Sequence, residues 1–211
     1  MLKINEIFHS IQGESSYNGI PCVFIRLTYC NLRCSYCDTE YAFYEGNDMS
    51  IKDILKKVKS YNCKLVEVTG GEPLLQKESI KLMKELIKLN YTVMLETGGS
   101  LPIKDVPKEV IKIIDFKCPT SKMHKKNDWN IIKDITEHDE IKFVIGDKDD
   151  YEWSKEKIRD YNLKNKTILF SPVHDVLDSK KLSKWILEDS LNVRMQIQLH
   201  KHIWSPETKG V

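Results

Sequence analysis

Short apolar runs alternate with amphipathic helical segments along the chain, and this alternation constrains the fold more than any other feature. A helix is expected after Ser50, a suitable N-cap, and another over residues 77–89, where apolar side chains share one face. Because strand-helix alternation is typical of parallel sheets, we predict an α/β fold, a partial (β/α) barrel with a mostly parallel sheet. The expected strands are residues 1–7, 23–28, 65–69, 92–96, 111–116, 141–145, 167–170 and 193–199.

Length and charge narrow the function classes. The 211 residues fit one domain, 1–211, since the chain shows no repeat, low-complexity tract or linker. A formal net charge of +2 argues against a nucleic-acid partner and favours a small molecule. No apolar stretch approaches the roughly 18 residues of a membrane span, and the start of the chain does not resemble a secretory signal. We therefore expect a cytoplasmic protein without a membrane partner.

Four polar loops follow expected strands. In α/β barrels the active site lies at the carboxyl ends of the strands, so these loops are expected to meet at one mouth. They cover residues 30–39, 69–73, 96–99 and 117–121.

The first of these loops carries three cysteines, Cys30, Cys34 and Cys37, spaced C-x3-C-x2-C. Each thiolate can bind a different iron of a [4Fe-4S] cluster, which leaves the fourth iron free to chelate the amino and carboxylate groups of a methionine. A zinc site is the alternative, but its fourth ligand would have to come from outside the loop, for example from Cys22 or His9. A purely electron-transferring cluster is a further alternative.

The other cysteines are interpreted differently. Disulfides are rare in a reducing compartment, so Cys22, Cys63 and Cys118 are expected to be small buried apolar residues. Cys118 is the least clear of the three, because it lies in a loop.

The cysteine spacing, with Tyr36 before the last cysteine, resembles the signature of the radical S-adenosylmethionine (SAM) superfamily. Gly70-Gly71-Glu72-Pro73 is similar to the G-G-E-P motif of that superfamily, although by itself it is also compatible with a tight turn. The resemblance implies a radical SAM fold and a cluster that reductively cleaves SAM to a 5'-deoxyadenosyl radical. Bare backbone at Gly70 and Gly71 would approach the methionine amino group, with the Glu72 carboxylate nearby.

A second resemblance comes from Ser10-Ile11-Gln12-Gly13-Glu14, which is similar to the S-x-Q-G-E segment of the 7-carboxy-7-deazaguanine synthase family. Gln12 and Glu14 can match the donors and acceptors of a pterin edge, and Gly13 allows a ring to approach the backbone. An ordinary turn is the alternative.

Arg26 lies among apolar residues of an expected strand, where its guanidinium needs a partner. The resemblance implies that this partner is the substrate carboxylate, and a structural ion pair is the alternative. Asp38-Thr39 resembles the C-D-[ST] segment of the family, which implies that Thr39 ligates Mg²⁺. Without the resemblance, Thr39 would be interpreted as a cap or turn residue.

Further site residues follow from the same two resemblances. Gln198-Leu199-His200-Lys201 is similar to Q-x-H-K and places His200 beside the substrate at the end of the last strand. Two departures stand out, Ser15 after Q-G-E and Asp115-Phe116-Lys117 in place of S-P-K. The expected SAM contacts are Tyr36, Cys37, Asp38, Gly70, Gly71, Glu72, Glu96, Thr97, Lys117 and Pro119, and the expected substrate contacts are Ile11, Gln12, Gly13, Glu14, Arg26, Thr69 and His200.

The resemblance implies a lyase of queuosine biosynthesis. It would convert 6-carboxy-5,6,7,8-tetrahydropterin to 7-carboxy-7-deazaguanine with loss of ammonia, using the cluster, SAM and Mg²⁺. No catalytic side chain is assigned beyond the cluster and SAM. The implied partners are an external electron donor such as flavodoxin or ferredoxin and a second copy in a homodimer. A glycyl-radical enzyme activating protein and an iron-sulfur electron carrier are the alternatives. Whether the C-terminal carboxylate reaches the site is left open.

Overall fold

The computed structural model describes residues 1–205 and 208–211, and its centre is one nine-stranded sheet. The strand order is β3-β1-β2-β4-β5-β6-β7-β8-β9. The strands are β1 (Leu2–Ile11), β2 (Pro21–Leu27), β3 (Asn47–Met49), β4 (Leu65–Gly70), β5 (Thr92–Thr97), β6 (Ile111–Asp115), β7 (Glu140–Ile145), β8 (Thr167–Pro172) and β9 (Arg194–Met195). All neighbours from β2 to β9 are parallel, whereas β1 pairs antiparallel with β2 and β3. The prediction of a mostly parallel sheet is confirmed.

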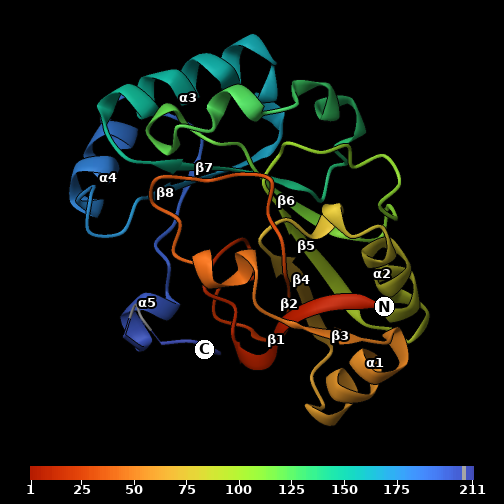
Figure 1. The fold of residues 1–211 in the computed structure, drawn as a ribbon. Helices are drawn as coiled ribbons and strands as arrows, with labels where there is room; N and C mark the ends of the chain where they lie inside the picture. The colour runs from red at the N-terminus through yellow and green to blue at the C-terminus, as the bar shows by residue number, and fades with distance from the viewer. Residues whose placement is uncertain (206–207) are drawn as a thin grey trace.

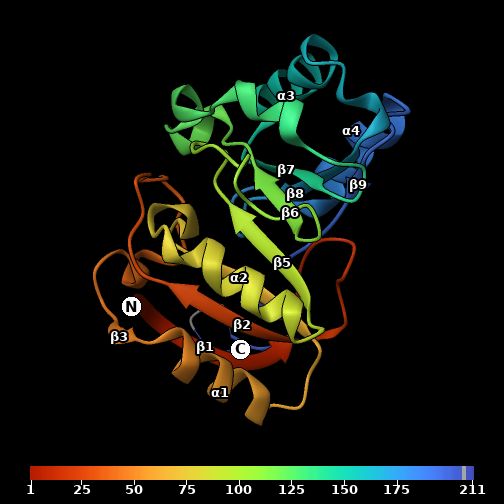
Figure 2. The ribbon, with the colours of Figure 1, turned by 90° about the vertical axis from the view of Figure 1, so that its right-hand side faces the viewer.

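Four helices lie along the outside of the curved sheet (Figures 1 and 2). They are α1 (Ile51–Ser60), α2 (Glu78–Lys88), α3 (Lys148–Asp160) and α4 (Ser179–Glu188). Ser50 is the N-cap of α1, and its side chain accepts a hydrogen bond from the Asp53 backbone N–H, as its residue type predicts. A short fifth helix, α5 (His200–Ile203), lies apart from these four, near the C-terminus (Figure 1).

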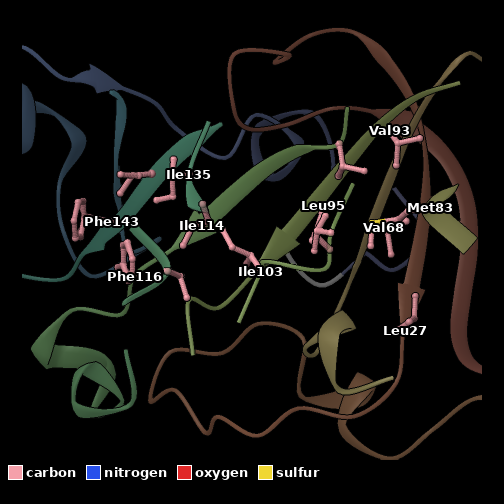
Figure 3. Close-up of a cluster of buried hydrophobic side chains, with 14 of the residues drawn as sticks. Leu27, Val68, Met83, Val93, Leu95, Ile103, Ile114, Phe116, Ile135 and Phe143 are labelled. Carbon is pink, nitrogen blue, oxygen red and sulfur yellow. The ribbon is translucent and has the colours of Figure 1, made fainter. Parts of the chain in front are cut away.

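The outer face of the sheet is apolar. Alternate strand residues such as Leu27, Val68, Leu95 and Ile114 are fully buried there (Figure 3). Met83 of α2 packs into the same cluster, because the apolar face of the helix turns toward the sheet. This side therefore supplies most of the core and fixes the curvature that encloses the other face.

The inner face changes character along the strands. Near the amino ends Phe8, Phe24, Met94 and Leu169 form a smaller apolar cluster. Side chains follow a period of two, so the next inner positions toward the carboxyl ends point the same way. Those positions are polar or charged, namely Arg26, Glu67, Thr69, Glu96, Asp115, Lys142 and Ser171.

Two expectations about the later part of the chain are wrong. The strand expected over residues 193–199 is only Arg194–Met195, because the chain then leaves the sheet and the Leu199 N–H bonds to the Gly13 carbonyl. His200 consequently begins α5 instead of ending a strand. The expected alternation of strands with amphipathic helices also fails in two connections. The connection of β5 to β6 contains no helix in its described residues, and that of β6 to β7 contains short 3-10 helices only.

No described helix has the length and apolar character needed to cross a membrane.

Candidate active site

A cavity of about 800 Å³ opens at the carboxyl ends of the parallel strands. Its lining includes residues from all four loops singled out in the sequence, so the prediction that they converge is confirmed. It also includes the segment 11–14 after β1 and residues 208–211, so Val211 reaches the cavity. Of the expected SAM and substrate contacts, all except Glu72 and Pro119 line this cavity.

The cysteine loop is held against the glycines that follow β4. Tyr29, directly before the first cysteine, has a φ of 78°, and its carbonyl accepts a hydrogen bond from the Glu72 N–H at 2.7 Å. A Cβ on Gly71 would lie 2.3 Å from the Tyr29 oxygen and 2.8 Å from the Cys30 Cβ. Only glycine allows this approach, which brings the two motifs together.

The three thiols of Cys30, Cys34 and Cys37 are partly buried and face the cavity. Burial raises the pKa of all three, that of Cys34 to about 11, so the free thiols are protonated at neutral pH. Metal binding would displace these protons. Among the described residues no three His, Cys, Asp or Glu side chains are gathered around a single-ion site. A four-iron cluster does not require such a site, because each thiolate binds a different iron.

Glu72 has a structural position that the sequence interpretation did not foresee. Its carboxylate is fully buried and accepts hydrogen bonds from the Thr97 hydroxyl, the Gly98 N–H at 2.8 Å and the Leu74 N–H at 3.0 Å. Burial raises its pKa. Glu72 joins the loops after β4 and β5 and is absent from the cavity lining, and its expected contact with SAM stays a prediction. Pro119, the other exception, likewise stands outside the cavity lining.

The segment after β1 is rigidly held. The Gln12 amide donates to Glu67 at 2.5 Å, and its oxygen accepts from the Glu14 N–H at 3.1 Å. A Cβ on Gly13 would lie 2.2 Å from the His200 Nδ1, so glycine is required for the close packing of this segment on α5. His200 therefore lies beside Gly13, next to the segment expected to contact the substrate, although it begins a helix and does not end a strand.

Arg26 has a protein partner. Its Nε donates to the Glu6 carboxylate at 2.7 Å, and the guanidinium stacks near the rings of Phe8 and Tyr41. The structural ion pair that the sequence left open is thus present. Arg26 nevertheless lines the cavity, and the hydrogen bond to Glu6 uses only its Nε.

Asp38 and Thr39 follow the last cysteine and also line the cavity. The Thr39 hydroxyl donates to Asp38 at 2.8 Å, and Lys201 pairs with Asp38 at 2.6 Å. Lys201, despite the burial of Asp38, lowers the pKa of that carboxyl below its ordinary range. Both oxygen-bearing side chains therefore stay available on the cavity wall as acceptors for a cation or a donor.

Sequence reasoning missed three inner-face groups. Lys142 forms ion pairs with Glu14 at 2.7 Å, with Glu96, and with Asp115 at 3.5 Å. Asp115 also pairs with Lys117 at 2.8 Å. The available signal was that each of these charged residues lies within an expected buried strand, although the sequence does not show which face it points to. The groups not named as site residues are Glu67, Asp115 and Lys142.

Burial dominates the acidity of the carboxyls here. It raises the pKa of Glu67 to about 8 and that of Glu96 to about 7. At Glu96 the adjacent Lys142 opposes this rise, while the charges of Glu14 and Asp115 add to it. Glu14 is the exception, since the adjacent Lys142 overcomes burial and lowers its pKa to about 2. His200 has a lowered pKa because it is buried, so its ring is neutral at neutral pH.

A curved parallel sheet with a three-cysteine loop at the carboxyl end of β2 defines a protein of the radical SAM class, and residues 24–120 match the family described as the Radical SAM superfamily. Over 100% of both chains, the protein is 47% identical to a 7-carboxy-7-deazaguanine synthase from Koribacter versatilis. A synthase of the same name from Chlorobaculum tepidum is 44% identical over 100% of this chain and 97% of its own. The chain therefore belongs to the 7-carboxy-7-deazaguanine synthase family.

Solved structures agree on the fold. QueE from Escherichia coli superposes with a TM-score of 0.78 over 94% of each chain, at 23% identity. SuiB from Streptococcus suis, solved bound to SAM, gives 0.55 over 81% of this chain and 45% of its own, at 17% identity. Superfamily membership implies a [4Fe-4S] cluster and SAM as cofactors. It also sets aside the zinc interpretation, and membership of the synthase family sets aside the activating-protein and electron-carrier alternatives.

Proposed function

We propose that the protein converts 6-carboxy-5,6,7,8-tetrahydropterin to 7-carboxy-7-deazaguanine and ammonia. One observation carries the proposal, namely that a single cavity joins the cysteine loop to the segment 11–14 in a chain 47% identical over its full length to a synthase of this name. The conversion contracts the ring and releases one ammonia without net oxidation, so SAM is regenerated.

Cys30, Cys34 and Cys37 would hold the cluster, and the backbone of Gly70 and Gly71 would lie beside the methionine of SAM. The cluster and SAM together supply hydrogen abstraction from an unactivated carbon. The partial burial of the thiols and the 3.4 Å hydrogen bond from the Leu32 N–H to the Cys30 sulfur suit a cluster, whose sulfurs accept such bonds.

The protein side chains would orient the pterin. Glu14 is ionised and would accept hydrogen bonds from N–H groups of the ring. The hydrogen bond from Gln12 to Glu67 holds the Gln12 backbone and amide in one position beside the ring. The terminal nitrogens of Arg26 would bind the substrate carboxylate. Neutral His200 would close the pocket beside Gly13. Holding the ring in one orientation directs abstraction to one carbon and limits side reactions.

The proposal gives Mg²⁺ a single protein ligand. Thr39 is the residue that would ligate it, because its hydroxyl lines the cavity next to the Asp38 carboxylate. A magnesium ion tolerates few protein ligands, since it keeps waters and takes substrate oxygens.

Anaerobic turnover tests the function. The reconstituted protein is given SAM, Mg²⁺, dithionite and the pterin, and product mass and 5'-deoxyadenosine are measured together. We expect deazaguanine product in large excess over 5'-deoxyadenosine, because SAM is recycled. An absence of this product from protein with a full cluster would overturn the proposal. Replacing dithionite with flavodoxin or ferredoxin tests the proposed external donor, and light scattering tests the proposed homodimer.

A further inference from the structure

Lys142 lines the cavity and is almost fully buried. It extends from the inner face of β7, its side chain is only 6% exposed, and it contacts carboxylates from three separate parts of the chain. Glu14 follows β1, Glu96 belongs to β5, and Asp115 ends β6. A lysine whose partners come from three elements fixes their relative positions more than a simple pair could.

The path of the segment after β1 explains why such a link is needed. β1 lies near one edge of the sheet, whereas β7 and β9 lie toward the other. The Ser15 N–H bonds to Gln196 at 2.7 Å and the Ser16 N–H to Glu140 at 3.1 Å, so this segment crosses the open interior to the far strands. Lys142 holds Glu14 at the middle of that crossing, at 2.7 Å.

We infer that Lys142 is a positioning residue of the reaction, one that holds Glu14 on the substrate side and Glu96 on the SAM side at a fixed separation. The inference rests on the proposed function and adds a group that neither sequence motif contains. The role is positional because the ammonium is surrounded by carboxylates and acts on the ligands through them.

Electrostatics give the role a measurable signature. The charged or titratable groups around Lys142 are Glu14, Glu96 and Asp115 in contact, with Glu67, Lys117 and His200 nearby. Without the lysine, burial would raise the pKa of Glu14, as it does that of Glu67. Activity that needs the Glu14 carboxylate would then be lost at low pH and recovered only at higher pH.

The test compares Lys142→Met with Lys142→Arg and a matched control, Lys112→Met. Lys112 is also a buried lysine in an ion pair, 3.0 Å from Asp139, but it lies outside the cavity lining. For each protein with a full cluster, pterin KM, kcat and the pH profile of kcat/KM are measured per folded molecule. SAM cleavage by dithionite without pterin is measured in parallel.

We expect Lys142→Met to raise pterin KM roughly tenfold or more, the cost of losing a hydrogen bond between charged groups. The acid-side midpoint of its pH profile moves to higher pH, and Lys142→Arg restores the midpoint. Lys112→Met lowers thermal stability but leaves KM and the midpoint unchanged.

A Lys142→Met enzyme with wild-type KM and midpoint would overturn the inference, and so would equal shifts in the control. If wild type itself makes no deazaguanine while cleaving SAM, the proposed function fails instead. Should Lys142→Met not fold, Lys142→Arg alone decides, because a positional role predicts an altered KM with an unmoved midpoint.

Discussion

The two ends of the sheet are built differently, although the same strands make both. At the amino end Phe24, Met94 and Leu169 fill the interior. On the outer face of the same end, Lys112 pairs with Asp139 at 3.0 Å, and both side chains are buried outside the cavity lining. At the carboxyl end Lys142 pairs with three carboxylates that line a cavity. A buried pair of opposite charges stabilises one structure, whereas a surplus of carboxylates leaves acceptors for a ligand. The difference separates structural charge from functional charge.

The largest effect is expected at the carboxyl end, from Cys34→Ala. A cluster with two protein ligands is not retained, so we expect loss of iron and of at least about 1,000-fold in activity. Cys118→Ala is the matched control, since Cys118 is fully buried, outside the cavity lining and hydrogen-bonded to Ser154. Iron and sulfide content with visible absorbance decide the outcome. Full iron in Cys34→Ala would contradict the assignment of the loop.

The amino end is tested by Asp139→Ala. This change leaves the ammonium of Lys112 buried without its partner, a loss of about 3–5 kcal/mol when a buried pair is broken. Asp139 also accepts from the Thr136 N–H and the Lys112 N–H, which adds to the loss. Urea unfolding measures the effect, and pterin KM should stay at the wild-type value. A changed KM would erase the contrast between the two ends.

The sequence predicted the sheet, both early helices and the convergence of the four loops, because strand-helix periodicity and loop position are local properties. It failed where partners are remote. Residues 196–199 have strand-like composition, but the bond from Leu199 to Gly13 draws them off the sheet. The motif around Glu72 did not indicate that its carboxylate accepts hydrogen bonds from Thr97 and Gly98, which belong to another loop. Lys142 was missed because its three partners are far away in the chain.

A smaller effect is expected where the segment after β1 meets α5. In Gly13→Ala the added Cβ would lie 2.2 Å from the His200 Nδ1, so the ring and the segment 11–14 can no longer pack as they do. We expect pterin KM to rise about tenfold, or about 1.4 kcal/mol, with unchanged SAM cleavage in the absence of pterin. Gly19→Ala is the control for backbone strain without a clash, since its φ is 89° and nothing lies within 4 Å of the added Cβ. Equal KM values for both variants would show that the ring does not contact substrate.

Glu67 lies between the apolar and the charged halves of the interior, and its effect is expected only in the pH dependence of stability. Burial raises its pKa from 4.5 to about 8, so the folded state holds a proton that the unfolded state releases. Its contribution to stability is therefore full below pH 4.5 and is lost as pH rises through about 8. Glu67→Gln keeps an acceptor for Gln12 and removes the titration.

Anaerobic thermal unfolding from pH 5 to pH 9 measures this contribution. The melting temperature of Glu67→Gln should exceed that of wild type increasingly as pH rises, by about 2–4 °C for each kcal/mol. The difference should be smallest at pH 5, because both side chains are then neutral. A constant difference across the range would mean that Glu67 is ionised throughout and belongs with the charged half of the interior. A difference that widens with pH would mean that Glu67 is neutral in the folded protein, and that the apolar part of the interior ends and the charged cavity begins at this residue.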